Sequence, residues 1–170
     1  FTEGQTLEIQ DIGNFNDGYA ITKFKNVTST GATGSNLTFP DTDFPMFRAA
    51  DAYLMYAEAV KRGGGGSEAT ALDYVNQVRT RAYGGSTDGN ITSGELTLDF
   101  ILDERARELY WECSRRTDLV RFGKFTGSAY LWPWKGNAAL GASTDGKYDI
   151  FPLPDSDVNA NSNLQQNSGY

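Results

Sequence analysis

The stretch TLDFILDERARELYWECSRRTDLVRFGKF (residues 97–125) is dense in both charged and large apolar residues. Its apolar residues recur at helical spacing, which predicts a helix with one buried face. These residues are Leu98, Ile101, Leu102, Leu109 and Cys113. Thr97 is a suitable N-cap, so we expect the helix to run from there to about Cys113. A short turn over residues 118–122 is expected to follow it.

The charges of this stretch predict structural ion pairs. Glu104, Glu108 and Glu112 are spaced four residues apart, where like charges repel each other. Compensating charges are expected nearby, and the predicted members of the network are Arg105, Arg115, Arg116, Arg121, Asp51, Glu58 and Asp118, together with the three glutamates. We expect Arg105 to reach Asp51 or Glu58 on a preceding helix.

The composition excludes several classes of function. The net charge of −7 argues against nucleic-acid binding, since a basic surface is needed to neutralise phosphates. Histidine is absent, which removes the commonest general base and the usual transition-metal ligand. With Cys113 as the single cysteine, no internal disulfide can form. No apolar run reaches the roughly 20 residues that cross a bilayer.

The organisation along the chain is that of one domain with three parts. Residues 1–40 are expected to be mostly loop, with a possible short strand at residues 19–24. Residues 41–125 are expected to form a helical core, whose first two helices cover residues 45–62 and 68–83 and are antiparallel because their connection is short. Residues 126–170 are rich in turn residues and aromatic rings, so we expect an irregular segment that wraps over the helices. Since the sequence begins with Phe1 and not with Met, we expect the chain to be a piece of a larger protein.

Several motifs resemble the C-terminal region of the SusD/RagB family of nutrient-binding lipoproteins. They occur in the family's order, namely FRAADAYLMYAEA (47–59), VNQVRTRA (75–82), ERAREL (104–109), Glu112 with RR (115–116), DLVRFG (118–123), FPLP (151–154) and NLQQNSGY (163–170). Two departures are Cys113, where a glycine is usual, and Ser168, where a proline is usual. The last of these motifs resembles the natural C-terminus of the family.

The resemblance implies an all-α fold of tetratricopeptide-like helix pairs with long irregular loops. It also implies a non-enzymatic lipoprotein of the bacterial outer membrane, attached through an N-terminal lipid that lies outside this sequence. The implied partners are a glycan and a SusC-like TonB-dependent transporter. Since much of the ligand site usually lies in the N-terminal part of such proteins, we expect this segment to be mainly scaffold.

The candidate glycan-binding residues are Tyr130, Trp132 and Trp134. Sugars present apolar C–H faces that stack on aromatic rings, and an indole N–H can bond a hydroxyl. An extended backbone around Pro133 would point both tryptophans to the same side, with Lys135 and Asn137 adding hydrogen bonds. The alternative is that these rings only anchor a loop to the core.

Two other functions remain open. A helical-repeat module could dock the transporter without a sugar site of its own. A carboxylate-based glycosidase would need an acid and a second carboxylate, but arginine partners keep carboxylates ionised and make them poor acids. The oxygen-rich segments at residues 155–161 and 11–18 resemble calcium loops only in part. We therefore expect turns there, and neither a metal nor a cofactor.

Overall fold

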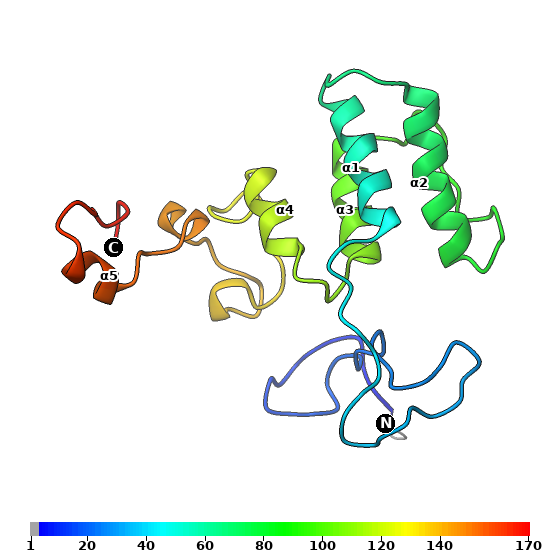
Figure 1. Ribbon diagram of the computed structural model, residues 1–170, viewed down its shortest axis with the longest axis horizontal. Helices are drawn as coiled ribbons and strands as arrows, with labels where there is room; N and C mark the ends of the chain where they lie inside the picture. The colour runs from blue at the N-terminus through cyan, green and yellow to red at the C-terminus, as the bar shows by residue number, and fades with distance from the viewer. Residues whose placement is uncertain (1–3) are drawn as a thin grey trace. The chain divides into compact units, whose positions relative to one another are not determined.

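The structure, a computed structural model, describes residues 4–170. The chain divides into two compact units, the first ending at Met46 and the second comprising Phe47–Tyr170. Among the described residues the regular secondary structure is helical and includes no strand (Figure 1), which confirms the predicted all-α class. No helix among these residues has both the length and the apolar character needed to span a membrane.

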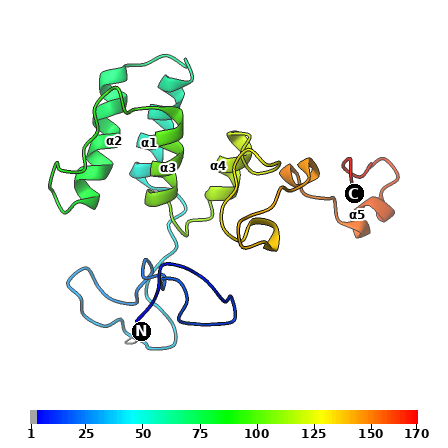
Figure 2. The same ribbon diagram turned by 180° about the vertical axis from the view of Figure 1, so that it is seen from behind.

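Three helices form the core of the second unit. They are α1 (Ala49–Lys61), α2 (Glu68–Ala82) and α3 (Leu98–Glu108), and α1 packs against the other two. The first pair is antiparallel and lies side by side in both views (Figure 1, Figure 2), as the short connection predicts. Thr97, the predicted N-cap of α3, accepts a hydrogen bond from the Phe100 amide, and Ser67 caps α2 in the same way by accepting one from the Thr70 amide.

The hydrophobic core lies between these helices and the loop before α3. Its members, exposed by 9% or less, are Leu54, Ala57, Ala71, Val75, Ile91, Leu96 and Ile101. Small residues such as Ala57 and Ala71 face each other's helices, which lets the two backbones approach closely. This core fixes the relative positions of α1, α2 and α3, and therefore of the charged side chains that they carry.

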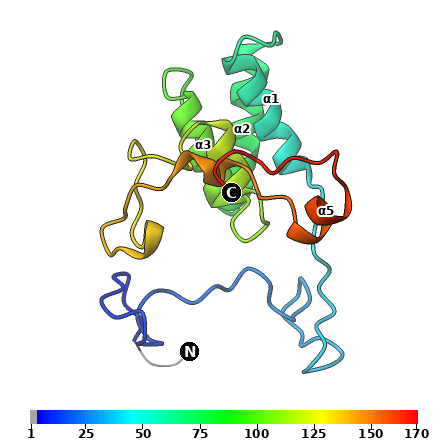
Figure 3. The ribbon, with the colours of Figure 1, turned by 90° about the vertical axis from the view of Figure 1, so that its left-hand side faces the viewer.

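The second unit continues through α4 (Arg115–Arg121) into a long irregular tail, which Figure 3 shows from the side. The tail contains η1 (Lys135–Asn137), η2 (Gly146–Asp149) and α5 (Asp155–Ala160), joined by turns and extended segments. We call residues 47–123 the helical frame and residues 124–170 the aromatic tail. The sequence predicted no regular element in the tail, so its short helices are additions to that prediction.

The third helix is shorter than predicted. It ends at Glu108, and the next residues turn sharply because Trp111 and Cys113 have φ angles of 60° and 61°. A helix cannot continue through the left-handed region, which costs non-glycine residues free energy. Cys113 is consequently exposed instead of buried.

Two other expectations about local structure were wrong. Phe47, which falls within the helix predicted at residues 45–62, lies before α1 and is 88% exposed. Residues 19–24 form no strand, and residues 4–46 of the first unit contain only isolated bridges, at Thr6–Asp17 and Val27–Thr33. A short alternating segment needs a pairing partner to become a strand, and loop residues flank this one on both sides.

Candidate functional site

The glutamates of α3 are buried and held by arginines of neighbouring segments. Glu104 accepts from Arg79 at 2.6 Å and from Arg107 at 2.7 Å. Glu108 is paired with Arg81 of α2 and, at 2.7 Å, with Arg48. Each carboxylate therefore contacts two guanidinium groups.

Arg48, which is not among the residues predicted to form ion pairs, bonds to both sides of the turn that follows α3. Its guanidinium binds both carboxylate oxygens of Glu112, at 2.7 and 2.8 Å, and also donates to the Glu108 backbone carbonyl at 3.0 Å. The hydrogen bonds to Glu112, helped by the charge of Glu108, raise the pKa of Arg48 above its usual value. The signal in the sequence was the position of Arg48 directly before an apolar helix, within the family-like FRAAD motif.

A second cluster joins α1, α3 and α4. Arg105 donates to Asp51 at 2.7 Å, one of its two predicted partners, and to Asp118 at 2.9 Å. The Arg105 and Asp118 side chains are only 6% and 3% exposed. Glu58, the other predicted partner, instead pairs with Arg62 at 2.7 Å and with Arg121. Burial lowers the pKa of Arg121, an effect that the charge of Asp51 opposes.

Arg115 and Arg116 differ from the prediction, because neither is paired with a carboxylate among the described residues. Arg115 donates to the Leu102 carbonyl at 2.8 Å and to the Tyr130 hydroxyl at 2.9 Å. Arg116 donates to the Tyr148 carbonyl at 2.7 Å. These two arginines of α4 therefore connect the helical frame to the aromatic tail.

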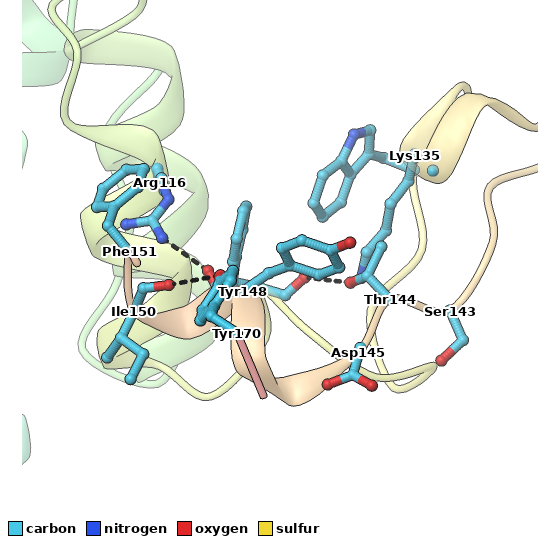
Figure 4. Close-up of a pocket in the computed structure, with 12 residues that line it drawn as sticks. Arg116, Lys135, Ser143, Thr144, Asp145, Tyr148, Ile150, Phe151 and Tyr170 are labelled. Atoms are coloured by element: carbon cyan, nitrogen blue, oxygen red, sulfur yellow. Dashed lines mark hydrogen bonds between the residues drawn. The ribbon is translucent and has the colours of Figure 1, made fainter. Parts of the chain in front are cut away.

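An aromatic pocket of about 640 Å³ lies where α4 meets the tail (Figure 4). The rings that line it come from segments far apart in the sequence, namely Phe125, Trp132, Tyr148, Phe151 and Tyr170. The hydroxyl of Tyr170 donates to the carbonyls of Ile150 at 3.0 Å and Lys147 at 3.1 Å, which fixes that ring beside η2. Such a concave, ring-lined surface matches the shape and apolar faces of a sugar.

Of the three predicted glycan-binding residues, Trp132 alone lines this pocket. Tyr130 lies 6.0 Å from Trp132 between ring centroids, and the two rings share a neighbouring cavity of about 320 Å³. Trp134 has a φ of 68°, so the segment is not extended and the expectation that both indoles point to one side fails. The missed residues, Tyr148 and Tyr170, could not be placed in the pocket without the path of the tail.

Lys135 and Asn137, the polar residues expected beside these rings, differ in burial and in position. Lys135 is buried, with 3% exposure, and its ammonium donates to the carbonyls of Tyr130 at 2.9 Å and Gly127 at 3.2 Å. The same ammonium lies 4.7 Å from the centre of the Trp132 ring, within the range of a cation–π contact. Asn137 is exposed in a left-handed turn and does not line the pocket.

The two oxygen-rich segments, residues 155–161 and 11–18, form local structure within the chain. Within residues 4–170 no group of three or more acidic or cysteine side chains is arranged to hold a metal ion. Most of the segment at residues 155–161 folds into α5 in place of the expected turn. In the other segment, one oxygen of Asp17 accepts from the amides of Gln10 and Asp11, at 3.0 and 2.9 Å.

Comparison with known proteins gives a consistent result. The model of the SusD family matches residues 3–170. The starch-binding protein SusD of Bacteroides thetaiotaomicron is 45% identical over 164 residues, which are 96% of this chain but 28% of that protein.

Solved structures agree with the sequence matches. A SusD superfamily protein from Bacteroides vulgatus superposes with a TM-score of 0.61 and 29% identity, covering 81% of this chain and 30% of that one. Surface glycan-binding protein A from B. thetaiotaomicron, in complex with laminarihexaose, gives a TM-score of 0.59 and 27% identity over 81% and 29% of the two chains. These neighbours fit the predicted tetratricopeptide-like fold, and the chain spans less than a third of their length.

Proposed function

Since the chain belongs to the SusD family, we propose that it is part of a non-enzymatic protein that binds glycans at the bacterial cell surface. The protein would pass oligosaccharides to a SusC-like TonB-dependent transporter and be held at the outer membrane by an N-terminal lipid outside these residues. The helical frame serves mainly as scaffold, and the aromatic tail offers a surface for sugar.

The observation that carries this proposal is the ring-lined pocket beside α4. Trp132, Tyr148 and Tyr170 surround a space of about 640 Å³, which has room for one or two sugar rings. A starch-binding relative and a structural neighbour with bound laminarihexaose support the same class of ligand. The pocket therefore provides a concrete site at which glycan binding by this chain can be tested.

The ion pairs support a non-enzymatic role. A glycosidase needs one carboxyl group that holds a proton near neutral pH and a second, ionised one close by. Glu104 and Glu108, the buried carboxylates of α3, each contact two arginines, so both are engaged in structural ion pairs. Binding without turnover is thus the expected outcome for any glycoside.

A docking module for the transporter is the second candidate. Tyr110 and Trp111 are 44% and 58% exposed, with their rings in edge contact at 6.4 Å, beside a largely apolar cavity of about 500 Å³. Exposed rings of this kind are frequent at protein interfaces. The two functions are compatible, because the exposed rings of Tyr110 and Trp111 do not line the glycan pocket, although Arg116 lines both cavities.

The test is calorimetric titration of the chain with a panel of neutral and acidic oligosaccharides. Trp132→Ala is expected to weaken binding at least tenfold, which corresponds to about 1.4 kcal/mol. Trp134→Ala is the matched control, since this neighbouring indole lies outside the pocket, and it should leave the affinity unchanged. Absence of binding to every probe by the folded chain, or equal effects of the two substitutions, would contradict a glycan site here.

A further inference from the structure

Two cations line the aromatic pocket, and within residues 4–170 neither has a carboxylate partner. Arg116 lies between the rings of Phe125 and Phe151, with its guanidinium carbon 4.9 and 4.1 Å from their centres. Lys135 also lines the pocket, with its ammonium 4.7 Å from the centre of the Trp132 ring. In the helical frame, by contrast, most arginines contact at least one carboxylate.

Both cations retain unused hydrogen-bonding capacity. Arginine has five N–H donors, and the contacts of Arg116 with the described residues go through Nη2 alone, to the carbonyls of Tyr148 and Asp149. Lysine has three donors, and Lys135 directs two of them to carbonyl oxygens. A buried ammonium without a counter-charge is unfavourable, so the pocket has a deficit of negative charge.

The single carboxylate that lines the pocket does not remove this deficit. Asp145 is exposed and accepts a hydrogen bond at 2.8 Å from the Lys147 amide, where it caps η2. In the view of Figure 4 its carboxylate points away from Arg116 and from Lys135. The lining thus has two cations against one solvated anion, although the chain as a whole has a net charge of −7.

We propose that the pocket recognises an acidic sugar unit, whose uronate carboxylate or sulfate ester meets the free donors of Arg116. The sugar ring stacks on Trp132, and the positive charge of Lys135 adds to the attraction at short range. A planar carboxylate can accept two parallel bonds from a guanidinium, which gives geometric selectivity as well as attraction. This inference rests on the proposed glycan-binding function and specifies the class of glycan.

The experiment is calorimetry of the chain with three probes of similar length. They are laminarihexaose, which is neutral, a hexamer of galacturonic acid, and a sulfated galactose oligosaccharide. At low salt we expect at least one acidic probe to bind about tenfold or more tightly than the neutral probe, and this advantage to shrink at ~1 M salt, where the screening length is about 3 Å. The two acidic probes reveal which anion the site accepts.

Two substitutions in the pocket and one control outside it test whether the preference for acidic sugars arises at this site. Asp145→Asn removes the only acidic side chain of the lining, so it should tighten acidic binding several-fold and leave neutral binding unchanged. Arg116→Gln should abolish the acidic preference, whereas Arg81→Gln, which removes an equal charge on α2 outside the pocket, should not.

The possible failures are distinguishable. If the neutral probe binds as tightly as both acidic probes, the acidic preference is overturned and glycan binding stands. If no probe binds to the folded protein, both proposals fall. Arg116→Gln also removes the stacking on Phe151 and so can loosen the tail. The Asp145→Asn variant keeps this contact, so its result tests the preference for acidic sugars independently.

Discussion

The helical frame and the aromatic tail use their cations in opposite ways. In the frame, guanidinium groups meet carboxylates, as Arg79 meets Glu104 and Arg105 meets Asp118. These pairs are largely buried and connect helices distant in the sequence. Removing one member leaves an uncompensated charge in a poorly solvated place, so the network enforces one arrangement of the helices.

In the tail beyond Lys124, which pairs with the exposed Asp99, cations meet aromatic rings and backbone carbonyls. Lys135 lies over Trp132, and Lys147 lies 5.0 Å from the centre of the Tyr170 ring. Such contacts contribute about 0.5–1 kcal/mol each at exposed sites and leave the positive charge uncompensated. The difference teaches that cations fix the structure within the frame, whereas at the pocket, where Arg116 of α4 meets Lys135 of the tail, positive charge stays available to a ligand.

The largest expected effect is the loss of Arg105 from the frame. Arg105→Ala leaves the buried Asp118 without this partner and frees Asp51, so the free energy of unfolding should fall by about 3–5 kcal/mol. Thermal and urea denaturation measure this change.

The control for that prediction is a surface pair. Lys124 contacts Asp99 at 2.6 Å, but the Asp99 side chain is 78% exposed. Lys124→Ala should therefore cost no more than about 1 kcal/mol. Similar losses from the two substitutions would remove the distinction between buried and exposed pairs on which the comparison rests.

The frame was largely predictable from the sequence because its signals are local. Helical spacing of apolar residues, the caps Ser67 and Thr97, and the glycines after the first helix each act within a few residues. Which carboxylate meets which arginine was less predictable. Arg105 reaches one of its two candidate partners, and Asp118 became its second partner because α4 folds back against α3.

A smaller effect is expected from the cap of α3. Thr97→Ala removes the side chain that accepts from the Phe100 amide at 3.1 Å, and loss of such a cap costs about 1 kcal/mol. The cost should appear in global unfolding, since α3 carries much of the ion-pair network. Thr97→Ser, which retains the hydroxyl, is the matched control and should recover most of the stability.

A substitution in the tail should loosen only the surrounding segment, whereas a substitution in the frame should lower the global stability. Tyr170→Phe removes a hydroxyl that donates to the Lys147 and Ile150 carbonyls, both near the surface. We expect an unchanged melting temperature and faster amide exchange at residues 147–150, because only this segment loses a constraint. A clear drop in the melting temperature would mean that tail and frame unfold as one unit.

The candidate site was harder to predict than the frame. Its rings come from residues 125, 132, 148, 151 and 170, which no periodic pattern relates. Trp132 could be found because aromatic residues cluster around it, but the same reasoning wrongly grouped Trp134 with it. The left-handed backbone at Trp134 is set by the turn into η1, which is a contact-dependent feature that composition does not reveal.

The smallest expected effect concerns acid at the turn before α3. Glu95 accepts from the amide and the hydroxyl of Thr92, both at 2.8 Å, and these two bonds hold the pKa of Glu95 below its usual value of 4.5. A lowered pKa means that the bonds stabilise the turn above pH 4.5 and lose this effect as the pH falls through the folded value. Exchange of the Thr92 amide, followed by NMR and divided by the intrinsic rate of an unprotected amide at each pH, should accelerate over that range.

Glu95→Gln separates this local effect from the frame. A neutral amide oxygen can still accept both bonds but does not titrate, so the acceleration at Thr92 should disappear. Glu95 is solvent-exposed and bonds only within its own turn, so loss of its two hydrogen bonds should loosen the turn while the frame stays folded. If the frame opened first, its ion pairs would be weaker than their burial implies, and the contrast with the tail would narrow.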